Sequence, residues 1–178
     1  MEDLGFVVCD ADRIAHEIMV RGTPVYRRVV EYFGEDILDE DQEISRPRLG
    51  RIVFDDPDRL QLLNRLVHPA VSDVLKAWIA ERRTKGGHAA AQVPLLFESG
   101  MDTLGWDAVI CVSSSESRMI ERLEARGISS GEAGSRIAAQ MNIAEKELRS
   151  DGIIRNNGTM KELEKATRDA VANLRFER

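Results

Sequence analysis

Two carboxylates follow the first apolar run of this chain. Residues 6–9 are apolar, and Asp10 and Asp12 come directly after them. Parallel α/β folds open their ligand crevice at the carboxyl ends of strands, so acidic side chains at positions i and i+2 there can hold a cation or accept a proton. The pattern therefore predicts that chemistry takes place at this strand end.

A row of arginines lies downstream at helical spacing. Its members recur every four residues and are Arg118, Arg122 and Arg126. Like charges at that spacing repel by roughly 0.2–0.5 kcal/mol per pair, so the row favours an anion site such as one for phosphate. Arg136, with Gln140 four residues on, repeats the spacing. The alternative is an ordinary solvated helix face, because Glu121 and Glu124 are interspersed with the arginines.

Three other positions have both a chemical and a structural interpretation. Asn156 and Asn157 precede a glycine, so they fit a tight turn, although amide groups can also pair with the edge of an adenine. Glu98 ends an apolar run and is expected at the edge of the crevice. His68 precedes Pro69 and is either part of a helix break or a ligand-binding group.

Short apolar runs separated by helical stretches are typical of a mostly parallel sheet covered on both faces. The predicted strands are residues 5–9, 89–97, 106–112 and 152–155. Between the first two, helices are expected to begin at Pro24, after Ser45 and after Asp55-Asp56, with a break at Pro69 before a helix over 70–83. Downstream, helices are expected over 116–126, after Ser129 and over 162–174.

Composition limits the classes of function. The chain has 178 residues and a formal net charge of −6, which argues against broad nucleic-acid binding and favours small-molecule partners. No apolar stretch approaches membrane-spanning length and no leader-like segment is present, so a cytoplasmic protein without a membrane partner is expected. Cys9 and Cys111 lie in apolar runs, which predicts buried free thiols.

Six motifs in order along the chain resemble those of the dephospho-coenzyme A kinase family. They are Val8-Cys9-Asp10-Ala11-Asp12 with Ile14-Ala15, Arg48 with Val53-Phe54, Leu66-Val67-His68-Pro69, Val93-Pro94-Leu95-Leu96-Phe97-Glu98, Arg136-Ile137-Ala138-Ala139-Gln140 and Asp151-Gly152-Ile153-Ile154-Arg155-Asn156-Asn157-Gly158. The resemblance implies transfer of the γ-phosphate of ATP to the ribose 3′-hydroxyl of dephospho-coenzyme A, with Mg²⁺ present.

The resemblance also implies roles for individual residues. Asp12 looks like the catalytic base, and Asp10 like its neighbour that supports Mg²⁺. The implied dephospho-coenzyme A pocket consists of His68, Pro94, Leu95 and Glu98. The implied ATP site consists of Arg118, Arg122 and Arg136 for the phosphates and Asn156 and Asn157 for the adenine.

The implied fold is a three-layer, doubly wound parallel sheet similar to nucleoside-monophosphate kinases. It forms one kinase domain over residues 1–178, with a core of 1–22 and 86–178, a helical insertion of about 23–85 and a lid of about 115–145. The central first strand of that fold has no counterpart in these residues. Exposed backbone edges would result, and we expect low stability and self-association unless another chain fills the gap.

One family feature is missing from the sequence. The family carries a Gly-x-x-x-x-Gly-Lys-Ser/Thr loop, and these 178 residues contain none. Because that loop cradles the phosphates, we expect this polypeptide to be weakly active or inactive. A start codon assigned too late, a truncation and a natural non-catalytic variant all fit. The alternative function is a dephospho-coenzyme A or coenzyme A binding or regulatory module.

Overall fold

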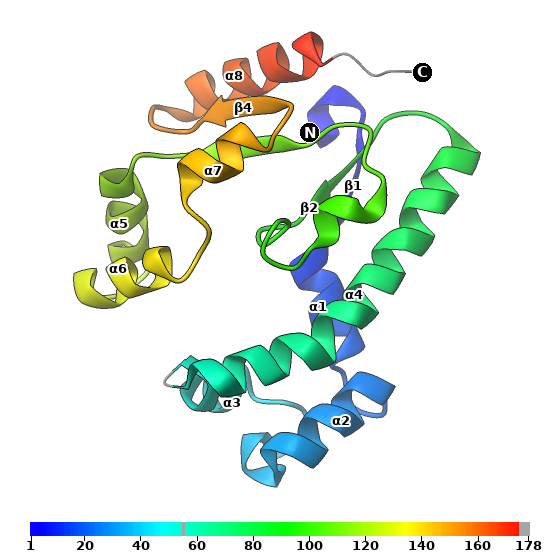
Figure 1. The fold of residues 1–178 in the computed structure, drawn as a ribbon, viewed down its shortest axis with the longest axis vertical. Helices are drawn as coiled ribbons and strands as arrows, with labels where there is room; N and C mark the ends of the chain where they lie inside the picture. The colour runs from blue at the N-terminus through cyan, green and yellow to red at the C-terminus, as the bar shows by residue number, and fades with distance from the viewer. Residues whose placement is uncertain (55, 175–178) are drawn as a thin grey trace. The chain divides into compact units, whose positions relative to one another are not determined.

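A computed structural model describes residues 1–54 and 56–174 and divides the chain into two compact units. The N-terminal unit is Glu2–Pro94, and the C-terminal unit is Leu95–Arg178 together with Met1. Figure 1 traces the elements of each unit. The predicted division into a core, a helical insertion and a lid differs from this one, because the first and second strands pair with each other and stay with the insertion helices in one unit.

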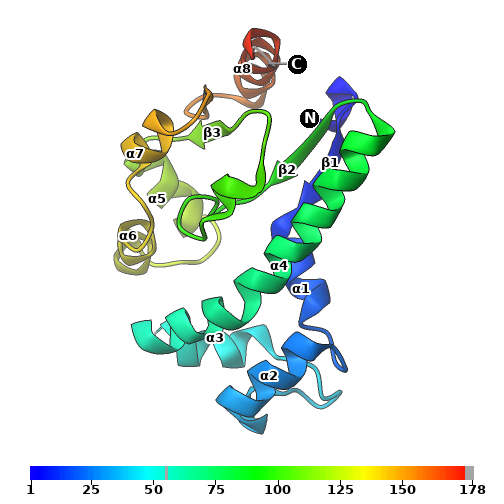
Figure 2. The same ribbon diagram turned by 45° about the vertical axis from the view of Figure 1, so that its right-hand side comes forward.

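A parallel strand pair and four helices build most of the N-terminal unit. Its elements are β1 (Val7–Asp10), α1 (Ala11–Ile18), α2 (Pro24–Phe33), α3 (Arg46–Phe54), α4 (Pro57–Lys85) and β2 (Ala89–Gln92), with short 3-10 turns at Glu2–Leu4 and Glu35–Ile37. β1 and β2 are in register from Val7 opposite Ala89 to Asp10 opposite Gln92. α1 packs along α4, as Figures 1 and 2 show. Val29, Ile37 and Leu75 are fully buried in this unit.

The predicted helix starts in this unit are confirmed. Thr23 accepts a hydrogen bond from the Tyr26 N–H, and Pro24 occupies the first turn of α2, where a missing N–H costs nothing. The carboxylate of Asp56 accepts from the N–H groups at the start of α4. Asp55, also part of the predicted start, lies outside the described residues.

The predicted break at His68-Pro69 is wrong, because α4 runs through Pro69. A proline inside a helix costs about 3 kcal/mol or more, since it removes a hydrogen bond and clashes with the preceding turn. The buried residues of α4 are Leu66, Val67, Val71 and Leu75. Burial at about 1.5–3 kcal/mol per large side chain is enough to keep the helix continuous. Figure 1 shows that α4 changes direction near its middle, the usual response to an internal proline.

The C-terminal unit repeats the combination of a parallel strand pair and covering helices. Its elements are a 3-10 turn (Met101–Leu104), β3 (Ile110–Ser113), α5 (Glu116–Glu124), α6 (Ser130–Ala138), α7 (Ile143–Leu148), β4 (Gly152–Arg155) and α8 (Met160–Asn173). β3 and β4 are in register from Ile110 opposite Gly152 to Ser113 opposite Arg155. α8 packs on β4, α7 packs on β3, and α5 lies beside α6 (Figure 2).

The α/β class with parallel strands is confirmed, but the strands are distributed differently from the expected single sheet. Within residues 1–54 and 56–174 they form two sheets of two strands each, β1 with β2 and β3 with β4. No ladder joins β2 to β3 in that part of the chain.

Two predicted strands are shorter in the structure. β2 stops at Gln92 rather than at residue 97, because Pro94 cannot donate to a ladder and the following residues form turns in which the Ser99 N–H donates to the Leu95 carbonyl. β3 begins only at Ile110. The preceding Trp106 is not part of the strand, and its indole N–H donates to the Met101 carbonyl at 2.8 Å.

Cys9 and Cys111 are free and buried, as predicted, and burial raises the pKa of both thiols. No helix of the described chain has the length and apolar character needed to cross a membrane.

Candidate functional site

Asp10 and Asp12 occupy the junction between β1 and α1. Asp10 is the last residue of β1 and caps α1, with its Oδ1 accepting a hydrogen bond from the Asp12 N–H at 2.9 Å. Asp12 lies in the first turn of α1 and is exposed. Its carboxylate has no hydrogen-bond or ion-pair partner among the described residues. One carboxylate is therefore partly committed to the fold, and the other is available for chemistry.

His68 and Pro94 belong to the same unit as the two aspartates. His68 lies in α4 and is half-buried, and this burial lowers the pKa of its imidazole. The side chain is therefore neutral near pH 7 and suits a hydrogen bond better than an ion pair with phosphate. Pro94 is exposed at the end of the unit.

Glu98 lies in the C-terminal unit, and its carboxylate has two partners there. Its Oε1 is 2.6 Å from Lys146 Nζ and accepts the Met141 N–H at 3.1 Å. The side chains of Lys146 and Glu98 are 12% and 21% exposed. Partial burial opposes ionisation of Glu98, but the bonds from Lys146 and the backbone outweigh it, so the pKa of Glu98 is lowered.

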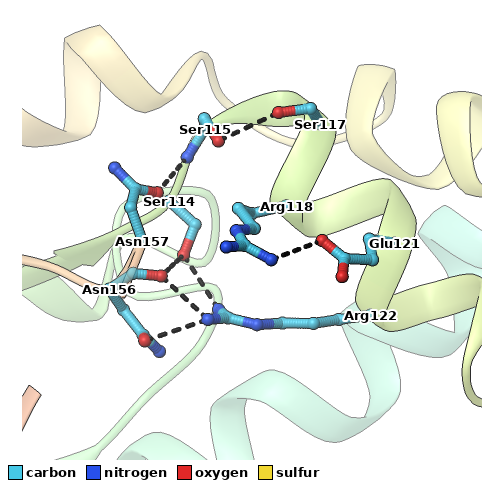
Figure 3. Close-up of polar contacts among 8 residues, drawn as sticks. All are labelled: Ser114, Ser115, Ser117, Arg118, Glu121, Arg122, Asn156 and Asn157. Carbon is cyan, nitrogen blue, oxygen red and sulfur yellow. Dashed lines mark hydrogen bonds and ion pairs between the residues drawn. The ribbon is translucent and has the colours of Figure 1, made fainter. Parts of the chain in front are cut away.

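The carboxyl ends of β3 and β4 are joined by a polar corner, which we define as Ser114, Ser115, Arg122, Asn156 and Asn157 (Figure 3). The guanidinium of Arg122 donates to Ser114 Oγ at 3.0 Å and to the backbone carbonyl and Oδ1 of Asn156 at 2.9 and 3.0 Å. Asn157 Oδ1 accepts from the Ser115 N–H at 2.7 Å. Both amide oxygens are engaged within the corner, so their Nδ2 groups are the parts available to a ligand.

The other predicted phosphate-binding arginines form exposed ion pairs. Arg118 is 2.7 Å from Glu121 and Arg136 is 2.7 Å from Glu132. Figure 3 draws the first of these pairs. Exposed pairs of this kind contribute about 0–1 kcal/mol, so Arg118 can exchange its carboxylate for a phosphate at little cost. Arg122 differs from these two arginines, because its guanidinium donates to the polar corner. An anion-binding row stays a prediction.

The two units divide the predicted site residues between them. Asp10, Asp12, His68 and Pro94 lie in the N-terminal unit. Those in the C-terminal unit are Leu95, Glu98, Arg118, Arg122, Arg136, Asn156 and Asn157. In the latter unit the structure brings Arg122, Asn156 and Asn157 together, whereas Glu98 belongs to a different cluster centred on Lys146.

Sequence reasoning missed Ser114 and Lys146. Ser114 has no sequence signal for a site, yet its hydroxyl donates to the Asn156 carbonyl at 2.9 Å. Lys146 has no distinguishing sequence signal, since it is one cation in a mixed-charge stretch and its partner is 48 residues away. Only the packing of α7 identifies it.

An open depression of about 340 Å³ lies elsewhere in the C-terminal unit, between β4 and α8. It is lined by Ile153, Arg155, Ala166, Asp169, Ala170 and Asn173. None of these is a predicted site residue, so the depression adds nothing to the site. The described residues also contain no cluster of three or more acidic, histidine or cysteine side chains that could hold a metal ion.

Comparisons with known proteins agree on one family. The family model described as dephospho-CoA kinase matches residues 1–162. A dephospho-CoA kinase of Lactobacillus johnsonii is 41% identical over 169 residues, which are 94% of this chain and 85% of the relative. One from Oryza sativa subsp. japonica is 39% identical over 177 residues, 96% of this chain and 74% of the relative.

Solved structures give the same fold. A crystal structure of a Thermus thermophilus protein superimposes with a TM-score of 0.76 at 28% identity and covers 98% of this chain and 87% of its own. Dephospho-CoA kinase from Campylobacter jejuni has a TM-score of 0.62 at 24% identity, covering 97% of this chain and 89% of that one, which supports the fold alone.

Proposed function

This chain belongs to the dephospho-CoA kinase family, and from that premise we propose that it serves the ATP-dependent phosphorylation of the ribose 3′-hydroxyl of dephospho-CoA, the last step of coenzyme A biosynthesis. The observation that carries the assignment of roles is the β1–α1 junction. It presents one carboxylate fixed by the backbone and a second that is exposed and unpartnered. Two free, buried cysteines suit a reducing compartment such as the cytoplasm.

Asp12 is the proposed base for the 3′-hydroxyl. Phosphoryl transfer needs a carboxylate that orients the acceptor hydroxyl and takes its proton, and most of the rate comes from positioning and charge neutralisation. Asp12 is exposed, and its backbone N–H is tied to Asp10 Oδ1, which fixes the first turn of α1 around it. The junction therefore holds the base in place without occupying its carboxylate.

Asp10 is the proposed protein ligand for Mg²⁺. Its Oδ1 accepts from Asp12, and its second oxygen has no partner among the residues that the structure describes. Mg²⁺ usually takes one or two carboxylates and completes its shell with waters and phosphate oxygens, so a strand end without a larger cluster fits this ion. When bound, the ion supplies charge neutralisation on the phosphates.

The remaining residues are proposed to bind the two substrates. Neutral His68 can share a hydrogen bond with dephospho-CoA. Pro94 and Leu95 are also proposed to contact this substrate. The free Nδ2 groups of Asn156 and Asn157 can donate to ring nitrogens of adenine. Arg118 and Arg136 can release their exposed carboxylate partners to contact the phosphates of ATP.

The 178 residues contain no Gly-x-x-x-x-Gly-Lys-Ser/Thr loop, and we propose that this polypeptide by itself has little or no kinase turnover. A coupled assay should show rates far below the enzyme-typical ~10 per second. Turnover near that value would contradict the proposal. The alternative function is a module that binds dephospho-CoA or coenzyme A without catalysis. Calorimetry with each ligand tests it, because such a module would bind dephospho-CoA but not ATP.

The role of Asp12 is testable in a version of the chain joined to a family loop and shown to be active. There Asp12→Asn should lower kcat by about 100-fold or more, the range typical of lost acid–base catalysis. The matched control is Asp58→Asn, which changes another exposed acid in the first turn of a helix. An Asp12→Asn variant within a few-fold of its parent would rule out Asp12 as the base.

A further inference from the structure

An ion pair joins α7 to the segment that follows β2. We call residues 95–104 the acceptor loop, because they include Leu95 and Glu98 of the proposed dephospho-CoA pocket. Lys146 of α7 contacts Glu98 at 2.6 Å, and the two side chains are 12% and 21% exposed. Partial shielding from water strengthens the attraction relative to a surface ion pair, and loss of Lys146 leaves Glu98 with backbone N–H groups, including that of Met141, as its remaining partners among the described residues.

A second cation, at the end of α7, makes two more contacts with the acceptor loop. Arg149, the residue that follows α7, lies 2.8 Å from Asp102. Its guanidinium carbon is also 4.4 Å from the centroid of the Phe97 ring, a cation–π distance. Phe97, Glu98 and Asp102 are therefore all contacted by α7 or by the residue that ends it.

α7 is itself anchored to the sheet. Between Lys146 and Arg149, Glu147 accepts a hydrogen bond from the buried Ser113 hydroxyl at 2.6 Å, at the end of β3. Glu98 also accepts the Met141 N–H, which lies where the proposed lid (residues 115–145) returns to this helix. α7 thus connects the end of β3, the last residues of the proposed lid and the acceptor loop.

We propose that Lys146 is a positioning residue for the acceptor substrate. It acts through Glu98, whose Oε1 it shares with the Met141 N–H, and so holds the acceptor loop in the shape that receives dephospho-CoA. This inference rests on the proposed function. It also changes the role of Glu98, which serves as the link between α7 and the loop rather than as a direct contact to the substrate.

The test compares Lys146→Met, which keeps the aliphatic stem and removes the charge, with Lys146→Arg, which keeps the charge. The matched control is Lys165→Met, because Lys165 lies on α8 and its side chain is 79% exposed. Hydrogen exchange read by mass spectrometry reports on the loop, and titration calorimetry measures dephospho-CoA affinity. Both use the 178-residue polypeptide.

We expect Lys146→Met to speed exchange in residues 95–104 and at Met141 while leaving β4 unchanged. Dephospho-CoA should bind about 2- to 30-fold more weakly, the range for residues that modulate a site indirectly. Lys146→Arg should restore most of both properties, and Lys165→Met should match the parent. Lys146→Met combined with Glu98→Gln should be no worse than Lys146→Met alone, because both changes break one link.

Different failures point to different conclusions. A parent polypeptide that binds no dephospho-CoA would contradict the proposed function in this chain, and the exchange data would still decide whether Lys146 fastens the loop. Unchanged exchange in residues 95–104 would overturn the inference. Faster exchange with unaltered dephospho-CoA affinity would also overturn it, since the link would then be structural only. Fully additive losses in the double variant would show that Lys146 does not act through Glu98.

Discussion

Asp10 has a structural duty that can be separated from its proposed chemistry. Its carboxylate caps α1, so Asp10→Ala should lower the free energy of unfolding by about 1 kcal/mol. Asp10→Asn should recover nearly all of that loss, because asparagine caps equally well, although its amide is a poorer Mg²⁺ ligand. Urea unfolding measures both variants, and equal losses would show that charge rather than capping matters here.

Glu98 should make stability depend on pH in a defined direction. Its pKa is lowered in the folded state, so its stabilising contribution is complete above the ordinary glutamate value of about 4.3 and is lost as pH falls through the folded-state pKa. The difference in unfolding free energy between the parent and Glu98→Gln should therefore be constant near neutral pH and shrink in acid. Urea titrations from neutral pH down to about pH 3 would reveal this, and a difference independent of pH would contradict it.

Arg122 holds the polar corner together through hydrogen bonds to Ser114 and Asn156. Arg122→Ala removes the donor to Ser114 and to two oxygens of Asn156, and should cost about 1–2 kcal/mol in unfolding free energy. Arg126→Ala, on the exposed part of the same row, should change it by less than about 0.5 kcal/mol. Similar effects of the two changes in chemical denaturation would mean that the polar corner does not stabilise the fold.

At the scale of elements, α8 starts two residues earlier than expected, and its cap explains why. Thr159 and Glu162 form a capping box, in which the Thr159 hydroxyl accepts from the Glu162 N–H and the Glu162 carboxylate accepts from the Thr159 N–H. Because Gly158 and Asn157 come directly before this cap, the box fixes the helix that follows the polar corner.

Thr159→Ala should lower the unfolding free energy by about 1 kcal/mol, the usual cost of a lost threonine cap. Met160→Ala is the control, since Met160 is 69% exposed and should be nearly neutral. Thermal unfolding followed by circular dichroism compares the two. A Thr159→Ala variant as stable as Met160→Ala would show that the capping box is dispensable.

At the scale of the whole molecule, both sheets have only two strands among the described residues. Isolated pairs of strands are marginal in water, and open edges invite pairing with other chains. Val7 of β1 and Val112 of β3 are 46% and 58% exposed, which adds apolar surface to these short strands. The polypeptide should therefore melt below ~60 °C and associate as its concentration rises.

Light scattering across a concentration series, combined with calorimetry, tests this expectation. Enlarged species and an early transition would agree with it. A monomer that melts cooperatively above ~60 °C would show that two-stranded sheets suffice for this chain.

Local sequence determined much of this protein. The caps at Thr23 and Asp56, the strand Gly152–Arg155 and the buried cysteines follow from nearest-neighbour chemistry and apolar spacing, which act over a few residues. The motifs around Asp10, His68, Glu98 and Asn156 were sufficient to indicate the family that the comparisons show.

Tertiary structure decided the rest. The continuity of α4 through Pro69 depends on burial that offsets the cost of the proline, and that burial comes from helices distant in sequence. Arg122 bonds to Asn156 and Glu98 pairs with Lys146, and these partners are 34 and 48 residues apart in the sequence. Such contacts form only when folding closes long loops, which costs conformational entropy. A local sequence pattern therefore does not determine which cation pairs with which oxygen.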